Sequence, residues 1–462
     1  MSDRSQGIFD PELIRRYDQT GPRYTSYPTA VQFHEGFDEV AYREQARLSN
    51  AAGGPLSLYF HLPFCDTICY YCACNKIVTR NRRRAGPYLE RVHREIELQA
   101  ALFDPARVVE QLAWGGGTPT FLSDGEMRAL MAQTRRHFRL RDDDEGEYSI
   151  EVDPREADAG TIALLRELGF NRLSLGVQDL DPAVQRAVNR IQSEEQTLAV
   201  IEAARREGFR SVSVDLMYGL PLQTLDSFAR TLDRVIAAGP DRLSVFNYAH
   251  LPQMFKTQRQ IDAGQLPPPA EKLRILGHTI ERLTEAGYVY IGMDHFARPD
   301  DELARAQREG SLYRNFQGYS THAECDLVAM GITAIGKVGP SYAQNLRTLD
   351  AYYERIDAGR LAIFRGVLLD ADDLLRRDVI NGLICNFRLD KTRIEAAHGI
   401  VFDDYFAEEL ERLQALAADG LVELLPDAIV VLPAGRLLIR NVCMVFDRYL
   451  GAGPGARFSK VI

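Results

Sequence analysis

Short apolar runs alternate with longer amphipathic segments between residues 55 and 250, and this alternation constrains the fold more than any other feature. The apolar runs predict six strands: Leu56–Phe60, Gln111–Trp114, Tyr148–Val152, Arg172–Val177, Val212–Leu216 and Leu243–Asn247. The segments between them predict helices near 87–102, 123–137, 159–168, 195–207 and 224–238, with Ser123 and Asp158 as N-caps. Alternating strands and helices are typical of α/β proteins with a parallel sheet. Six units without a sign of reversed strand order favour a partial, TIM-like (β/α)6 barrel over a doubly wound sheet, although periodicity alone leaves both open.

The rest of the chain forms two regions that flank this barrel. Residues 1–54 predict an N-terminal arm or lid, with a short helix from Pro11 and then a segment rich in turn-formers, Gly21–Thr29. Residues 55–365 predict the barrel and an extension, with loops at 292–297 and 315–319. Residues 366–462 predict a small, mainly helical, winged-helix-like domain. Its expected elements are helices Asp370–Phe387 and Tyr405–Ala418, paired strands Leu421–Leu424 and Ala428–Leu432, and a final helix Ala434–Tyr449.

Polar residues follow the predicted strands at their carboxyl ends. They are His61 with four cysteines, Gly115–Thr118, Glu151 with Asp153, Gln178, Asp215, and Asn247–His250. Active sites of barrel enzymes are built at this face. Because six separate strand ends agree, we expect the functional site there.

Four of the seven cysteines, Cys65, Cys69, Cys72 and Cys74, lie within ten residues. Thiolates are soft ligands that favour zinc, copper(I) or iron–sulfur clusters. Three thiolates spaced Cys-x3-Cys-x2-Cys can hold three irons of a [4Fe–4S] cluster and leave one iron open. Cys74 follows Cys72 by only two residues, so we expect it not to be a ligand. Zinc sites normally combine two separated Cys/His pairs, and the other three cysteines are isolated.

Composition narrows the class of protein. The net charge is −10, and no predicted element of the C-terminal region concentrates Lys and Arg, so we expect no nucleic-acid partner. No apolar run approaches the roughly 18–20 residues that span a bilayer. The first residues lack the charged-then-apolar pattern of a signal peptide. We therefore expect a cytoplasmic protein without a membrane partner, in which the thiols stay reduced.

The cysteine motif after the first barrel strand resembles that of radical S-adenosylmethionine (SAM) enzymes. A wider set of segments resembles the oxygen-independent coproporphyrinogen III oxidases of that superfamily: Gly21–Ala30, Phe64–Arg80, Trp114–Thr120, Ser149–Glu156, Asn247–Pro252, Gly292–Glu309, Asn315–Tyr319 and Ile384–Leu389. Small departures are Ala73, Tyr71 and Gly336-Lys337. The resemblance runs from the arm to the last predicted domain and implies a partial barrel of the radical SAM type.

The resemblance also implies the cofactors and their contacts. Cys65, Cys69 and Cys72 would hold one [4Fe–4S] cluster, whose open iron binds SAM. Contacts to this SAM are implied at Tyr59, Gly116, Glu151 and Arg190. A second SAM is implied beside it, with contacts at Tyr71, Gly117, Thr118, Gln178, Asp215, Ala249 and Ile335. No catalytic side chain is implied beyond the cluster and the SAM-derived radical.

The implied reaction is oxidative decarboxylation of two propionate side chains of coproporphyrinogen III to vinyl groups. The product is protoporphyrinogen IX, an intermediate of anaerobic haem biosynthesis. The implied partners are this substrate and a reductant such as flavodoxin or ferredoxin, and a monomer is expected. Arg23, Tyr24 and Tyr27 stand between two prolines in the arm, and we expect them to close over the substrate. Two alternatives share the scaffold, a haem-binding chaperone and a haem-modifying radical SAM enzyme. The chaperones carry Asp-Phe after the third cysteine, where this chain has Ala73-Cys74.

Overall fold

The computed structural model describes residues 7–450, which form two compact units. The first, here called the barrel unit, comprises Phe33–Lys272 and Glu324–Leu368. The second, the helical unit, comprises the described residues up to Gln32, Leu273–Ala323 and those from Leu369 onward. Three separate stretches of sequence therefore build the helical unit.

Six parallel strands form the centre of the barrel unit, and they neighbour one another in chain order. They are β1 (Leu56–Leu62), β4 (Val108–Gly116), β6 (Glu147–Val152), β7 (Arg172–Gln178), β8 (Ser211–Tyr218) and β9 (Arg242–Asn247). Each contains a predicted strand and extends it by up to five residues. The predicted parallel sheet without reversed strand order is thereby confirmed.

The sheet continues beyond β1 on its other side. There β1 pairs in parallel with β14, and antiparallel strands follow. These strands are β14 (Asp326–Met330), β15 (Ile335–Val338), β16 (Ser341–Asn345) and β17 (Ile363–Leu368), and β5 (Arg139–Leu140) pairs with β4. The sequence from 327 to 338, which is mostly apolar and contains two glycines, forms most of β14 and all of β15.

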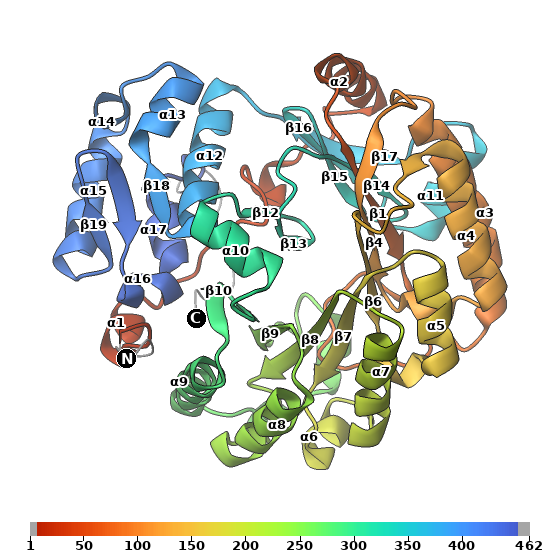
Figure 1. Ribbon diagram of the computed structural model, residues 1–462, viewed down its shortest axis with the longest axis horizontal. Coiled ribbons are helices and arrows are strands. Elements are labelled where there is room, and N and C mark those ends of the chain that lie inside the picture. The colour runs from red at the N-terminus through yellow and green to blue at the C-terminus, as the bar shows by residue number, and fades with distance from the viewer. Residues whose placement is uncertain (1–6, 451–462) are drawn as a thin grey trace. The chain divides into compact units, whose positions relative to one another are not determined.

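Helices lie along one side of the six strands (Figure 1). They are α3 (Ala85–Ala100), α4 (Asp124–His137), α5 (Ala159–Glu167), α6 (Pro182–Ala187), α7 (Glu194–Arg206) and α8 (Leu225–Ala238), while α2 (Glu39–Ala52) and α11 (Leu349–Asp357) complete the unit. Ser123 and Asp158 are N-caps as predicted. Helix α2 was not predicted within the arm, although Asp38 caps its start and Gly53 ends it in the left-handed conformation.

The two faces of the central strands differ in exposure. Along β6, β7 and β8, buried residues alternate with partly exposed or exposed ones. Registers place Glu151 opposite Ser174, and Gly176 opposite Asp215. Since alternate side chains share a face, these residues line the face away from the helices. The core therefore lies between strands and helices, and the other face, here called the free face, carries the partly exposed side chains.

The helical unit contains short hairpins and helices. Its elements are α1 (Pro11–Arg16), most of α9 (Pro269–Glu285), β10 (Val289–Gly292), β11 (His295–Ala297), α10 (Glu302–Glu309), β12 (Tyr313–Asn315), β13 (Gly318–Ser320), α12 (Ala371–Asn386), β18 (Arg388–Asp390), α13 (Lys391–His398), α14 (Phe402–Tyr405), α15 (Ala407–Ala418), β19 (Val422–Leu424), β20 (Ala428–Val431), α16 (Pro433–Leu437) and α17 (Ile439–Val445). The helix from Pro11 and the pairing of β19 with β20 are confirmed.

Three details of this unit correct the prediction. The expected loops at 292–297 and 315–319 belong to the hairpins β10–β11 and β12–β13, whose turns use positive φ at Gly292 and Gly318. The expected final helix is two short helices that meet at Leu438, which caps both.

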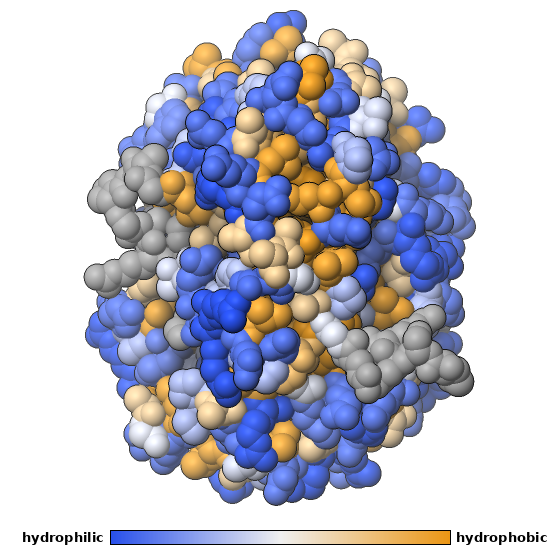
Figure 2. Space-filling view, turned by 90° about the vertical axis from the view of Figure 1, so that its left-hand side faces the viewer, coloured by the Kyte–Doolittle hydropathy of each residue, from blue (hydrophilic) through white to orange (hydrophobic). Residues whose placement is uncertain are grey.

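Among the described residues, no helix is long and apolar enough to cross a membrane. Figure 2 shows a face on which hydrophobic residues gather toward the middle and hydrophilic residues lie mainly around them.

Candidate active site at the carboxyl ends of the strands

The cysteine loop is pinned at both ends by backbone hydrogen bonds. It leaves β2 (Phe64–Cys65), returns through β3 (Ile77–Val78), and these strands pair in parallel. The Ile77 N–H donates to the carbonyl of Pro63 at 2.7 Å, and the Thr118 N–H donates to the carbonyl of Phe64 at 2.7 Å. The loop is thereby tied to the ends of both β1 and β4.

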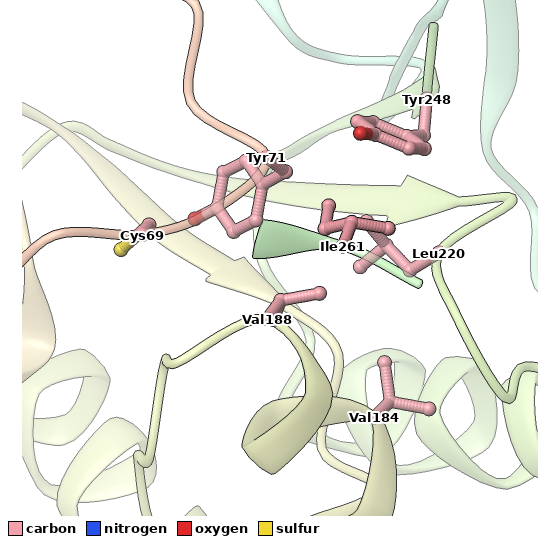
Figure 3. Packing of buried hydrophobic residues seen from close by; sticks show 7 residues of the cluster. All are labelled: Cys69, Tyr71, Val184, Val188, Leu220, Tyr248 and Ile261. Carbon is pink, nitrogen blue, oxygen red and sulfur yellow. The ribbon is translucent and has the colours of Figure 1, made fainter. Parts of the chain in front are cut away.

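Apolar packing holds the middle of the loop. Cys69 and Tyr71 pack in one cluster with side chains that follow β7, β8 and β9: Val184, Val188, Leu220, Tyr248 and Ile261. Figure 3 shows the sulfur of Cys69 pointing away from the other six side chains. The apolar side of the loop is therefore buried, while the sulfur of Cys69 remains available to a ligand.

Hydrogen-bond donors lie beside the thiols. The Thr118 hydroxyl lies 3.6 Å from Cys65 Sγ. Arg155 Nη2 and Arg190 Nη1 each lie 3.5 Å from Cys69 Sγ. Asp153 pairs with both guanidinium groups, at 2.7 and 3.0 Å. Such donors stabilise negative charge on sulfur.

The surroundings shift the pKa values of the Cys72 and Cys65 thiols in opposite directions. A hydrogen bond with Cys74, followed by the charge of Lys76, lowers the pKa of Cys72 to about 6 despite its burial. Burial instead raises the pKa of Cys65 to about 11. A thiolate is the form that binds metal. Cys72 is thus ready to bind iron as a thiolate, whereas bound metal would have to deprotonate Cys65.

The spacing of the sulfurs distinguishes between the metal alternatives. Two sulfurs on one zinc ion are at most about 4.6 Å apart, because each Zn–S bond is about 2.3 Å. The Sγ atoms of Cys65, Cys69 and Cys72 do not all lie within 4.8 Å of one another. In this arrangement the three thiols are too widely spaced to bind one metal ion together, whereas an iron–sulfur cluster binds each thiol at a different iron and does not require such close spacing.

Three successive glycines allow the end of β4 to approach its neighbours. A Cβ on Gly115 would meet Glu151 at 2.8 Å, and one on Gly116 would meet the His61 ring at 2.7 Å. A Cβ on Gly117 would meet the backbone oxygen of Phe64 at 2.6 Å. A side chain at Gly115, Gly116 or Gly117 would therefore displace the Glu151 carboxylate, the His61 ring or the start of the cysteine loop, respectively.

Two carboxylates line the free face. Glu151 accepts the Gly116 N–H at 3.0 Å, and Asp215 accepts the Ser174 hydroxyl at 3.2 Å. The Glu151 residue is exposed, but protein atoms around its carboxylate limit hydration of the charged form and raise its pKa to about 7. The negative charges of Asp215 and Cys72 raise this pKa further. Burial likewise raises the pKa of Asp215 to about 6. Neither carboxylate has enough neighbouring positive charge to offset its burial, so a bound cation would stabilise the charged form of both groups.

The other predicted cofactor contacts lie on the same unit. Tyr59 is close enough to Glu151 for that charge to raise its pKa further. Gln178 has a φ of 68°, and its buried Oε1 has no hydrogen-bond partner among the described residues. Ala249 follows β9 and Ile335 begins β15, and their apolar side chains take no part in the hydrogen bonds above. The unpaired Gln178 amide is a position where a ligand donor would be expected.

Arg155 was missed by the sequence analysis, although it contacts a predicted cluster cysteine. It stands only two residues after Asp153, which marked the end of β6. Its N–H and guanidinium both donate to the Asp153 carboxylate. The feature of the sequence that could have indicated Arg155 is its position two residues after Asp153 at the end of a predicted strand.

The predicted substrate residues of the arm lie in the helical unit. Tyr24 and Tyr27 are each 2% exposed. The Tyr24 hydroxyl donates to Asp447 at 3.0 Å, and the Tyr27 hydroxyl accepts the Arg448 N–H at 3.1 Å. Arg23 is partly exposed and pairs with Asp294. Their contact with a substrate stays a prediction.

Comparisons with known proteins agree over almost the whole chain. Residues 59–235 match the family model described as the radical SAM superfamily, and residues 369–438 match the HemN C-terminal domain. The oxygen-independent coproporphyrinogen III oxidase of Pseudomonas aeruginosa is 58% identical over 454 residues, which cover 98% of this chain and 99% of the relative. The Escherichia coli K12 protein of that name is 53% identical over 455 residues, 98% of each chain.

A solved structure extends the comparison to three dimensions. Coproporphyrinogen III oxidase (HemN) from Escherichia coli, described as a radical SAM enzyme, superposes with a TM-score of 0.91 at 52% identity. The match covers 96% of this chain and all of that structure. The predicted fold of the radical SAM type is thereby confirmed. The chain belongs to the oxygen-independent coproporphyrinogen III oxidases of the radical SAM superfamily.

Proposed function

We propose that this protein oxidatively decarboxylates two propionate side chains of coproporphyrinogen III to vinyl groups, which gives protoporphyrinogen IX. Each propionate loses a β-hydrogen atom, carbon dioxide and one electron. The identity to enzymes of this name over 98% of the chain carries the proposal. The cysteine loop, the glycine turn and the strand-end carboxylates are the parts that such a reaction needs.

The thiols of Cys65, Cys69 and Cys72 would hold the [4Fe–4S] cluster that the family uses. Bound together, the reduced cluster and SAM supply a radical that can remove an unactivated hydrogen atom. Thr118, Arg155 and Arg190 donate hydrogen bonds toward the cluster sulfurs. Apolar packing of the loop excludes water from its inner side.

The barrel unit would bind SAM through complementary charge. Glu151 offers a carboxylate to the ammonium group or ribose hydroxyls, while Arg190 offers a guanidinium to the carboxylate. The Glu151 carboxylate is held in place by the Gly116 N–H, and Tyr59 lies beside it. A second SAM would contact Tyr71, Gly117, Thr118, Gln178, Asp215, Ala249 and Ile335. The unpaired Gln178 amide and the cation-deficient Asp215 support this second position.

The partners follow from the chemistry. The cluster needs a one-electron donor, such as flavodoxin or ferredoxin, and Arg23, Tyr24 and Tyr27 would contribute to substrate binding. All seven cysteines are free, which supports a cytoplasmic location. A monomer would suffice, because one chain contains every residue assigned to the cluster and SAM.

An anaerobic assay tests this function. Protein with a reconstituted cluster is given reductant, SAM and coproporphyrinogen III, and protoporphyrinogen IX and carbon dioxide are measured. We expect two molecules of carbon dioxide for each protoporphyrinogen IX formed. An intact cluster that cleaves SAM but releases no carbon dioxide from this substrate would refute the proposal.

A further inference from the structure

Arg314 in the helical unit is a buried cation without an anion. It lies in the middle of β12 and is only 5% exposed. Its Nε and Nη1 atoms are buried and have no hydrogen-bond partner among the described residues. A guanidinium stays protonated at physiological pH, and burial of an unpaired charge is unfavourable. The position therefore calls for an anion that the chain itself does not supply.

Aromatic packing fixes the direction of this side chain. Tyr319 stands opposite Arg314 in the β12–β13 hairpin, and the guanidinium carbon lies 4.9 Å from the centre of its ring. The Tyr319 hydroxyl occupies the space that a Cβ on Gly292 would enter, at 2.5 Å. A ring face attracts a cation but does not satisfy its in-plane N–H groups. The stacked guanidinium is therefore held in place while two of its nitrogens remain unpaired.

Positive charge predominates around Arg314. Arg440 is 2% exposed and donates to the carbonyls of Gly21 and Pro22. Burial, and then the charge of Arg23, lower the pKa of Arg440 to about 10, and Arg314 adds to this effect. The nearby carboxylate of Asp294 already pairs with Arg23. Arg314, whose Nε and Nη1 atoms have no hydrogen-bond partner among the described residues, is the member of this group to which an incoming anion would be attracted.

We propose that Arg314 binds a propionate carboxylate of the porphyrinogen substrate, with Arg23 and Arg440 supplying supporting positive charge. This inference rests on the proposed function, which provides a substrate rich in carboxylates. Carboxylates are well matched to guanidinium donors. Arg314 is then a specificity-determining residue that recognises the acidic side chains of the macrocycle.

Binding of coproporphyrin III, the stable oxidised macrocycle with the same side chains, tests the inference without turnover. Its fluorescence is titrated with full-length wild-type, Arg314→Gln and Arg314→Lys protein. A hydrogen bond to a charged group contributes about 1.5–3 kcal/mol, so we expect roughly 10- to 150-fold weaker binding to Arg314→Gln. Arg314→Lys should recover part of the affinity because it keeps the charge. Arg388→Gln, an exposed position on β18, should bind like wild type.

The tetramethyl ester of coproporphyrin III separates carboxylate recognition from altered packing. Because the ester has no carboxylates, wild type and Arg314→Gln should bind it equally. SAM affinity and iron content should also be unchanged in Arg314→Gln. Equal binding of the free acid by both proteins, or an equal loss for acid and ester, would overturn the inference. Wild-type protein that binds the acid but does not decarboxylate coproporphyrinogen III would instead refute the proposed function.

Discussion

The two units contain buried or partly buried charged groups of opposite sign that lack a counter-charge among the described residues. In the barrel unit, Glu151 and Asp215 are carboxylates whose pKa values are raised to about 7 and about 6 by their surroundings. In the helical unit, Arg314 is a buried guanidinium with no ion pair among the described residues. SAM is a cation, and the proposed macrocycle carries carboxylates. Each unit therefore lacks the charge that one of the two ligands would bring.

A buried charge alone does not identify a ligand site. Glu95 on α3 is fully buried and its pKa is also raised to about 7. It accepts hydrogen bonds from the Gly331 N–H, the Asn345 amide and the Tyr352 hydroxyl, at 2.6–2.7 Å. The informative property is an unsatisfied group, and this separates Arg314 and Gln178 from Glu95.

The largest effect is expected from removal of a cluster ligand. Cys69→Ser removes the thiol beside Arg155 and Arg190 and should abolish iron binding after reconstitution, together with all turnover. Coproporphyrin III binding should persist, because Arg314 belongs to the other unit. Iron analysis, the absorption of the cluster and the fluorescence titration measure the two outcomes.

Cys74→Ala is the matched control for the cysteine loop. We predict that it keeps its iron, although loss of the hydrogen bond from Cys74 should raise the pKa of the Cys72 thiol. Complete loss of iron from Cys74→Ala would contradict the assignment of three ligands.

Glu151→Gln should have the next largest effect. The amide keeps the shape of the side chain but removes the charge that would attract SAM. Loss of a charged hydrogen bond predicts roughly 10- to 150-fold weaker SAM binding, measured by anaerobic calorimetry. The exposed Glu202→Gln on α7 serves as control. Coproporphyrin III affinity should not change in either variant.

The same variant has a pH signature. In wild type, Glu151 loses its proton as pH rises through about 7, so SAM affinity should increase from pH 6 to pH 8. Glu151→Gln does not titrate, and the increase should be smaller. An unchanged pH profile would show that this carboxylate does not bind the cation.

The barrel could be predicted from the sequence because its strands and its cysteine motif are each contained in a short stretch of the chain. Buried parallel strands are short apolar runs, and the proposed cluster ligands lie within eight residues of each other. The hairpins β10–β11 and β12–β13 were missed because strands of three or four residues show no measurable alternation. Helix α2 was missed because half of its residues are polar and the caps at Asp38 and Gly53 were not recognised.

The residues that tune the site depend on contacts between distant segments. Arg155 contacts Cys69 across 86 positions. Arg314 is significant because β13 covers its guanidinium and because Arg440 stands near it, 126 residues later. Arg314 has no motif, and Arg155 has only the neighbouring Asp153 as a signal, so burial and pairing had to be known before a role could be proposed for either residue.

Arg155→Gln should have an intermediate effect that leaves both ligands bound. N–H donors to cluster sulfurs raise the reduction potential. Removal of one of the two guanidinium donors to Cys69 should lower the potential of the cluster, by up to ~59 mV for a tenfold change in a one-electron equilibrium. Redox titration monitored by electron paramagnetic resonance measures the shift. The exposed Arg186→Gln on α6 is the control, and a potential unchanged in Arg155→Gln would exclude this role.

The smallest effect on the reaction is expected from Glu95→Gln, because this carboxyl group is already satisfied. SAM affinity should change by less than about twofold, while stability should respond to pH. The Glu95 pKa is about 7 in the folded protein and 4.5 when unperturbed, so the free energy of unfolding falls as pH rises between these values. The full loss is about 3 kcal/mol. Glu95→Gln lacks this proton, so its melting temperature should fall less from pH 5 to pH 8. A large loss of SAM affinity in Glu95→Gln would mean that raised pKa, rather than unsatisfied hydrogen bonding, marks the cofactor site.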